Sequence, residues 1–96
     1  MPGSNEISLK EAIKQLLKVY RLDDKLNEVR LINSWEKVVG KMISRHTGNI
    51  YIKKKKLFVS VDSAALKNEL SYSKENIIRM LNAEVGVKTI DEIIFI

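Results

Sequence analysis

The feature that most constrains the fold is a change of hydrophobic period in the middle of the chain. Residues 49–53 and 57–62 alternate between apolar and polar side chains. The apolar residues on both sides of them recur at the spacing of about 3.6 residues that an α-helix requires. Two short alternating runs joined at a bend predict a β-hairpin. A chain of 96 residues that also carries helices has room for one core, so we expect a single α+β domain.

The register of this hairpin follows from the lysines at its bend. With Lys54 and Lys55 at the tip, Tyr51 faces Phe58 whether the turn contains two residues or four. The same register pairs two further positions: Ile52 with Leu57, and Ile50 with Val59. A tight two-residue turn favours Asn-Gly, which is absent here, so the sequence predicts the looser four-residue turn.

Two helices are expected before the hairpin. Ser8 and Glu11 form a capping-box pair that marks the start of the first one, after a flexible N-terminus at residues 1–6, so that the domain covers residues 7–96. Its apolar side chains share one face: Leu9, Ile13, Leu16 and Tyr20. A second helix over residues 25–39 is expected to start at Asp23 or Asp24.

Trp35 is predicted to lie in the core, because one large aromatic side chain contributes much apolar area to a small domain. Gly40 either ends the second helix or allows close packing while residues 41–44 continue the helical pattern.

The segment after the hairpin predicts further helix and a last strand. Ser63 is expected to cap a helix that begins at Ala64, and residues 71–73 either kink it or separate it from another helix that ends at Gly86. Residues 89–96 predict the third strand of a small sheet. Without the first helix, and with a break at 71–73, the order becomes α-β-β-α-α-β, which is the order of the type II KH fold.

Composition argues against an enzyme. The chain has no cysteine, and His46 is the only histidine, so neither a zinc site nor a thiol nucleophile is expected. We expect no metal and no cofactor, and we expect His46 to flank the turn between helix and strand. The sequence shows no secretory signal and no apolar run long enough for a membrane span, so a cytoplasmic protein is expected.

The excess of positive charge directs attention to polyanions. Seventeen Lys and Arg against twelve Asp and Glu give a net charge of +5. Two groups of residues are the candidate nucleic-acid contacts: Lys53, Lys54, Lys55 and Lys56 with Tyr51 and Phe58 at the hairpin, and the stripe Lys10, Lys14, Lys18 and Arg21 on the first helix. The alternatives are that the lysines only protect the hairpin from aggregation, and that the two rings pack under the first helix or against Ile93 and Phe95.

The order of several short motifs resembles the DciA family of replicative-helicase loaders. They are Trp35 with Val39-Gly40, His46-Thr47, the L-x-V-x-V-x-S pattern of residues 57–63, Asn68-Glu69-Leu70, Leu81-Asn82 before Gly86, and the strand at 90–96. The resemblance covers residues 9–96. It implies a KH-like domain that helps to place the replicative DNA helicase on DNA and has no ATPase activity of its own.

Three departures limit what the resemblance carries over. Leu66 stands where family members often have Trp, and the long flexible tail of many members, which is implicated in partner binding, has no counterpart before Ile96. Residues 70–74 replace the Gly-x-x-Gly loop by which KH domains clamp nucleic acid. Lys74 and Arg79 near that loop are a further possible contact.

These observations favour a non-enzymatic accessory protein that binds the replicative helicase and contacts single- or double-stranded DNA weakly, without reading its sequence. Two alternatives stay open. One is a pure protein-interaction domain, in which Tyr51, Phe58, Ile93 and Phe95 meet a helicase or a second copy of the chain. The other is an RNA-binding KH-like protein.

Overall fold

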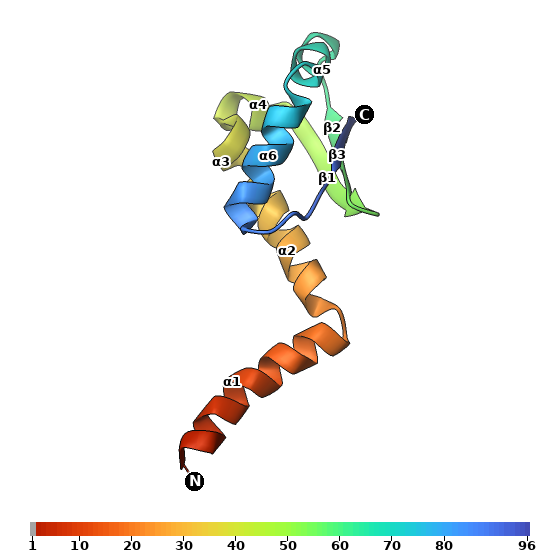
Figure 1. Cartoon of the computed structure of the whole chain (residues 1–96). Helices are drawn as coiled ribbons and strands as arrows, with labels where there is room; N and C mark the ends of the chain where they lie inside the picture. The colour runs from red at the N-terminus through yellow and green to blue at the C-terminus, as the bar shows by residue number, and fades with distance from the viewer. Residues whose placement is uncertain (1) are drawn as a thin grey trace.

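The computed structural model describes residues 2–96, with side chains from Ser8 onward. Its elements in chain order are α1 (Pro2–Val19), α2 (Leu22–Asn33), α3 (Trp35–Val39), α4 (Lys41–Arg45), β1 (Thr47–Lys53), β2 (Lys56–Val61), α5 (Ala64–Ser71), α6 (Lys74–Val85) and β3 (Glu92–Phe95) (Figure 1). Helices and strands share one core, so the fold class is α+β, as predicted. Among the described residues, no helix is both long enough and apolar enough to cross a bilayer.

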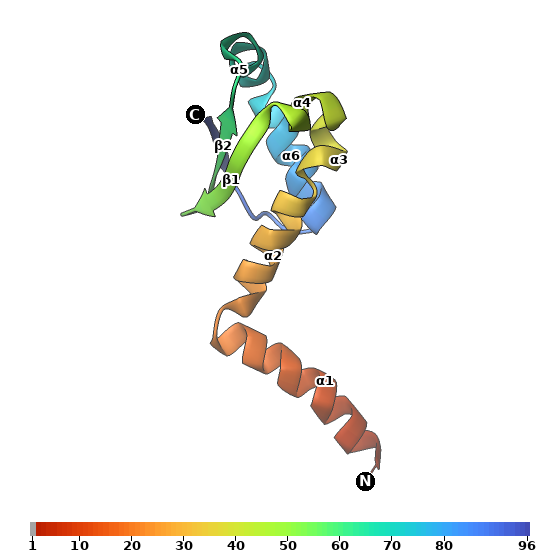
Figure 2. The ribbon, with the colours of Figure 1, turned by 180° about the vertical axis from the view of Figure 1, so that it is seen from behind.

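α1 forms an arm that extends away from the rest of the molecule, which we call the body (Figures 1 and 2). The arm gives the molecule an elongated shape of 62 × 23 × 20 Å. The helix begins at Pro2, so Ser8 and Glu11 lie within it, and the expected start at a capping box was wrong. The separation of a flexible segment at 1–6 from a domain at 7–96 stays a prediction.

α2 begins and ends at positions that the sequence pattern did not predict. It starts after Arg21, which has a left-handed backbone with φ of 56°, and Asp23 and Asp24 lie in its first turn rather than at its cap. Negative charges at this end of a helix interact favourably with the helix dipole. At the other end, the Ser34 hydroxyl donates to the Arg30 carbonyl oxygen over 2.9 Å. The single helix expected over 25–39 is therefore two helices, α2 and α3, with a break at Ser34.

The sheet has the strand order β1-β2-β3, with β1 antiparallel and β3 parallel to the central β2. The predicted hairpin register is confirmed, because Tyr51 pairs with Phe58, Ile52 with Leu57 and Ile50 with Val59. The predicted turn is wrong. Lys53 pairs with Lys56, which leaves a two-residue turn in which Lys54 and Lys55 have φ of 51° and 63°. Positive φ at both positions is the geometry of a type I′ turn, which follows the twist of the two strands without needing Asn-Gly.

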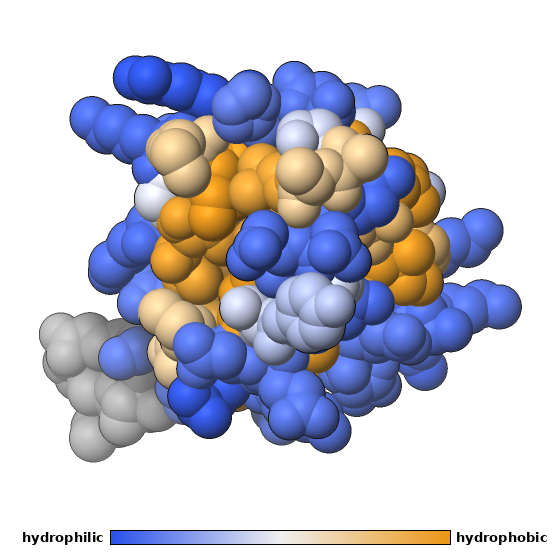
Figure 3. All heavy atoms as spheres, turned by 90° about the horizontal axis from the view of Figure 1, so that it is seen from above, coloured by the Kyte–Doolittle hydropathy of each residue, from blue (hydrophilic) through white to orange (hydrophobic). Residues whose placement is uncertain are grey.

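The core lies between one face of the sheet and helices α2, α3 and α6. Its fully buried side chains are Leu31, Leu57, Val59, Leu81, Ile90 and Ile93. Trp35 is 2% exposed, so its predicted place in the core is confirmed. Seen from above, apolar side chains also gather at the surface between hydrophilic ones (Figure 3).

The second half of the chain follows the predicted local signals closely. The Ser63 hydroxyl accepts a hydrogen bond from the Leu66 N–H and caps α5, and residues 72–73 separate α5 from α6. Gly86, with φ of 94°, ends α6. Gly40, with φ of 92°, ends α3, and α4 follows it at once.

Candidate nucleic-acid interface

One face of the sheet points away from the core, and we call it the outer face. Tyr51 and Phe58 lie on it as direct cross-strand neighbours, with ring centroids 4.8 Å apart and an angle of 11° between the ring planes. Ile94 of β3 is the partner of Phe58, so an apolar row crosses all three strands. Tyr51 is 45% exposed, and α3, α4 and α6 lie on the other side of the sheet in both views, while α1 extends away from it (Figures 1 and 2). The alternative that the two rings pack under the first helix is therefore wrong.

Ile93 and Phe95 do not belong to this surface. The parallel register pairs Ile93 with Leu57 and Phe95 with Val59, which are both core residues. Ile93 is fully buried, and the Lys74 ammonium nitrogen lies 5.8 Å from the centroid of the Phe95 ring. The alternative that the two rings meet Ile93 and Phe95 is therefore wrong, and Ile94 is the outer-face residue that the sequence interpretation missed.

Lysines border the apolar row at the tip of the hairpin. Lys53 and Lys56 are paired neighbours, each two residues along its strand from Tyr51 or Phe58, and therefore on the same face. Both are exposed. Glu92 is the β3 partner of Lys56 and brings one negative charge to this row. The outer face thus combines two cations with a stacked pair of rings, and its role as a nucleic-acid contact stays a prediction.

Lys54 and Lys55 occupy the turn itself, and Lys55 has a mixed environment. Its carbonyl oxygen accepts the Asp91 N–H over 2.9 Å. It also lines a hollow of about 190 Å³ together with Asp24 and Glu28 of α2 and Lys88. The other three hairpin lysines, Lys53, Lys54 and Lys56, do not line this hollow.

The predicted stripe on the first helix belongs to the arm. Lys10, Lys14 and Lys18 are exposed along α1, and Lys14 lies 3.9 Å from Glu11 in an exposed pair that contributes little. Arg21 follows α1 at the elbow between α1 and α2. The two predicted basic groups are therefore on different parts of the molecule, the hairpin on the body and the stripe on the arm.

Lys74 and Arg79 lie at the junction of α5 and α6. Together with residues 71–73 they line an open hollow of about 650 Å³. The Arg79 guanidinium donates to the side-chain oxygen of Asn76. Tyr72 beside them is 81% exposed, which the sequence interpretation did not anticipate.

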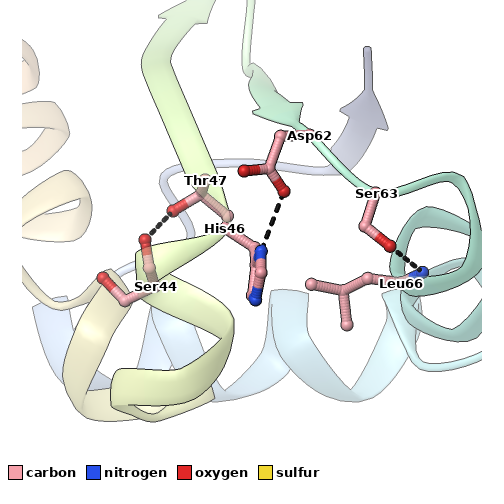
Figure 4. Close-up of polar contacts among 6 residues, drawn as sticks. All are labelled: Ser44, His46, Thr47, Asp62, Ser63 and Leu66. Carbon is pink, nitrogen blue, oxygen red and sulfur yellow. Dashed lines mark hydrogen bonds and ion pairs between the residues drawn. The ribbon is translucent and has the colours of Figure 1, made fainter.

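His46 takes part in a polar corner where α4 meets β1 (Figure 4). Its Nδ1 lies 2.9 Å from the Asp62 carboxylate, in a pair that is largely exposed. Next to it, the Thr47 hydroxyl donates to the Ser44 carbonyl oxygen over 2.7 Å and accepts a hydrogen bond from the Trp35 indole over 3.2 Å. The contacts confirm that His46 flanks the turn from helix to strand, and they fasten this corner to the core.

Comparison with known proteins agrees with the motifs along the chain. The model of the DciA family, described as a Dna(CI) antecedent, matches residues 8–95. A UPF0232 protein of Corynebacterium glutamicum (strain R) is 36% identical over 61 residues, which cover 64% of this chain and 34% of that relative. The matching region thus spans about a third of the length of this curated relative. Since the family model covers nearly the whole chain, this protein belongs to the DciA family.

Proposed function

We propose that this protein is a non-enzymatic accessory factor in loading the replicative DNA helicase, and that it holds DNA on the outer face of its sheet. Membership of the DciA family supports the role related to helicase loading. The observation that carries the DNA contact is the stacked pair Tyr51 and Phe58 beside Lys53 and Lys56. With this role, a cytoplasmic location is part of the proposal.

The chemistry of this face suits a single strand better than a duplex. Because the two rings stack on each other, each uses one of its faces, and the exposed side of Tyr51 leaves room for an unpaired base. Every base has a π-face, so such stacking does not select a sequence. Lysine ammonium groups neutralise phosphates as point charges and read no base either. The proposed binding is therefore weak, sensitive to salt and independent of sequence.

The body is also proposed to be KH-like. From α4 onward the elements follow the order α-β-β-α-α-β around a three-stranded sheet, which supports this proposal. The junction of α5 and α6 carries Ser71, Tyr72 and Ser73 and has no Gly-x-x-Gly loop, so the contact with nucleic acid is proposed on the hairpin rather than at this junction. The stripe Lys10, Lys14, Lys18 and Arg21 is proposed as a second, weaker contact with phosphates.

The test compares two double variants that lose the same charge. Lys53→Glu with Lys56→Glu changes the outer face, whereas Lys25→Glu with Lys41→Glu changes two exposed lysines on α2 and α4. Each is titrated into labelled single-stranded DNA, double-stranded DNA and RNA at two salt concentrations, with fluorescence anisotropy as the readout. We expect the outer-face variant to bind single-stranded DNA at least ten times more weakly. The salt slope, meaning the slope of log affinity against log salt concentration, should become less steep by about 1.4, because two phosphate contacts are lost.

The control variant is expected to lose about threefold in affinity through the lowered net charge alone. Equal losses in both variants would show that only net charge matters, and the outer face would be removed from the proposal. A clear preference for RNA over single-stranded DNA of the same sequence would favour an RNA-binding protein. No binding at low salt would leave a protein-interaction surface centred on Tyr51, Phe58 and Ile94.

Tyr51→Ala separates stacking from charge. Loss of one base-stacking ring costs about 1–3 kcal/mol of binding free energy, which is roughly 5- to 150-fold in affinity, and should leave the salt slope unchanged. Trp35 fluorescence reports whether the core is intact, because this side chain is buried on the opposite side of the sheet.

A further inference from the structure

β1 is an edge strand, and its outer edge pairs with no strand among the described residues. The strand order β1-β2-β3 leaves β2 as its one neighbour in the sheet (Figure 2). The two-residue turn makes Lys53 and Lys56 a hydrogen-bonded pair, and such pairs alternate with non-bonded pairs along an antiparallel ladder. Ile50 and Ile52 therefore turn their backbone N–H and C=O groups away from β2. An edge of this kind is a template for a further strand.

The aromatic row of the outer face ends at this edge with one ring surface uncovered. The rings of Tyr51 and Phe58 are nearly parallel, with centroids 4.8 Å apart, which is close to the spacing of neighbouring strands. The two rings therefore face each other across the strands rather than lying flat on the sheet. Phe58 has Tyr51 on one side and Ile94 on the other. The free surface of the Tyr51 ring thus points past β1, and this side chain is 45% exposed.

A row of charged residues ends at the same edge, two residues along from the rings. Lys53 of β1 pairs with Lys56, and Lys56 pairs with Glu92 of β3. Lys56 therefore has an acidic neighbour on one side, whereas Lys53 has only another lysine. Lys53 is exposed and forms no ion pair with any residue that the structure describes. Like charges directly opposite each other are unfavourable, so the open side of Lys53 attracts a carboxylate.

We propose that the edge of β1 binds an extended segment of a partner protein as a fourth strand, and that this segment carries an acidic and an aromatic residue two positions apart. Its backbone bonds to Ile50 and Ile52, its ring stacks on the free surface of Tyr51, and its carboxylate meets Lys53. The segment runs antiparallel to β1, because antiparallel pairing is the more stable. The acidic residue then precedes the aromatic one along the segment.

Two other occupants fit this edge less well. A second copy of β1, paired antiparallel about Tyr51, places Asn49 opposite Lys53, so the lysine still lacks a carboxylate. The sugar–phosphate backbone of DNA supplies acceptors for the N–H groups of Ile50 and Ile52 but no donors for their C=O groups, whereas a peptide backbone supplies both. The inference therefore goes beyond the proposed DNA contact and does not depend on it, although both use the ring of Tyr51.

The probe is a set of peptides of about eight residues, built of threonine and valine with glutamate and tyrosine two positions apart. A second peptide has lysine in place of glutamate. Each is labelled with a fluorophore and titrated with the full chain, with fluorescence anisotropy as the readout. We expect the glutamate peptide to bind roughly five times more tightly than the lysine peptide, because it places a carboxylate rather than a like charge opposite Lys53.

Methylation of peptide nitrogens tests the backbone pairing. Opposite Tyr51, the peptide tyrosine belongs to a non-bonded pair, so the residues on either side of it turn their N–H groups toward β1. N-methyl groups on these two residues should abolish binding. N-methyl groups on the glutamate and the tyrosine themselves point away from β1 and should leave the affinity unchanged, which makes this peptide the matched control.

Variants of the chain test the two side-chain contacts. Lys53→Glu should reverse the preference, so that the lysine peptide binds more tightly, and a variant that has simply unfolded cannot give this reversal. Lys25→Glu, at an exposed lysine of α2, is the control and should keep the preference. Tyr51→Ala should weaken the glutamate peptide roughly fivefold. Trp35 fluorescence reports whether the core of each variant is intact.

Hydrogen exchange locates the added strand. A saturating glutamate peptide should slow exchange at the Ile50 and Ile52 amides about tenfold or more, and should leave the Tyr51 amide, which faces β2, unchanged. Equal affinity for the glutamate and lysine peptides, binding of the peptide methylated beside its tyrosine, or unchanged exchange at Ile50 and Ile52 would overturn the inference. So would a dimer in sedimentation equilibrium that protects these two amides without any peptide. The titrations contain no DNA, so their failure leaves the proposed DNA contact intact, and a loss of DNA binding alone leaves the strand pairing intact.

Discussion

Two lysines at the tip of the hairpin adopt a backbone conformation that lysine disfavours. Lys54 and Lys55 have φ of 51° and 63° in the turn between β1 and β2. The left-handed region costs about 1–2 kcal/mol for a residue with a Cβ atom, and Asn-Gly is the pair that fits a type I′ turn best. The turn therefore keeps positive charge at the tip at a cost in stability, a combination common at functional positions.

We predict that Lys54→Asn with Lys55→Gly raises the free energy of unfolding by about 1–2 kcal/mol, because both new residues tolerate positive φ. Urea denaturation followed by Trp35 fluorescence measures the change. Lys54→Ala with Lys55→Ala is the matched control, since it removes the same charges and keeps the unfavourable backbone. A gain in the control equal to that in the test variant would mean that charge repulsion, not backbone strain, is relieved.

The buried indole of Trp35 depends on a single partner. Its Nε1–H donates to the Thr47 hydroxyl over 3.2 Å, and that hydroxyl donates in turn to the Ser44 carbonyl oxygen. We predict that Thr47→Val lowers the free energy of unfolding by about 1–3 kcal/mol, because it leaves the indole N–H without an acceptor in the core, although valine favours strands.

A double-mutant cycle followed by far-UV circular dichroism checks this interpretation. A Trp35→Phe background has no indole N–H that could lose its acceptor. Thr47→Val should therefore lower the free energy of unfolding much less there than in the natural chain. If the cost were the same in both backgrounds, the effect would come from the bond between Thr47 and Ser44 instead.

At the scale of single residues, the sequence determined the hairpin partners but not those on β3. Alternation in residues 49–53 and 57–62 leaves one register that buries Leu57 and Val59, so the contact of Tyr51 with Phe58 could be predicted. In the last strand, apolar side chains point to both faces of the sheet, since Ile93, Ile94 and Phe95 follow each other. Such a run does not show which side chains face the core, and only the pairing with β2 places Ile94 outside.

At the scale of elements, one side chain holds the link between α6 and β3. The Asn82 side-chain oxygen accepts the N–H groups of Thr89 and Ile90 over 2.9 and 3.0 Å, and its amide nitrogen donates to the Ile90 carbonyl oxygen over 2.9 Å. Ile90 is fully buried in the core just ahead of β3. Asn82 therefore fixes where the chain enters its last strand.

We predict that Asn82→Ala lowers the free energy of unfolding by about 2–4 kcal/mol, since it leaves three backbone groups without a hydrogen-bond partner at a partly buried site. Asn82→Asp should cost less, because one carboxylate oxygen still accepts both N–H bonds, although the other oxygen cannot donate to the Ile90 carbonyl oxygen and is repelled by it. Urea denaturation gives the free energies, and hydrogen exchange at the Thr89 and Ile90 amides should quicken in the alanine variant. Unchanged exchange there would show that the link is held by other contacts.

Element boundaries were predictable where local chemistry sets them. Ser63 caps α5 through its own hydroxyl, and Gly40 and Gly86 end helices with the positive φ that glycine allows. The break at Ser34 was not predictable in the same way. The apolar spacing continues across it, and only the bond from the Ser34 hydroxyl to the Arg30 carbonyl oxygen marks the place.

At the scale of the whole molecule, the body has a buried core to which the described side chains of the arm do not contribute. Among the residues with described side chains, the buried core extends from Leu31 to Ile93 and takes none from α1. The sequence predicted that α1 is amphipathic, but an apolar stripe looks the same whether it meets its own core or another protein. Its position outside the body could therefore come only from the three-dimensional structure.

This separation leads to a prediction about a truncated chain. Removing residues 1–20 should change the free energy of unfolding by less than about 1 kcal/mol, because the side chains described between Ser8 and Tyr20 contribute none to the buried core. Urea denaturation followed by Trp35 fluorescence gives the value, and the full chain studied in the same buffer is the control. The truncated protein should keep most of its affinity for single-stranded DNA, since the outer face of the sheet is intact. A truncated chain that fails to fold would show that the arm packs on the body in solution and that its apolar side chains belong to the core.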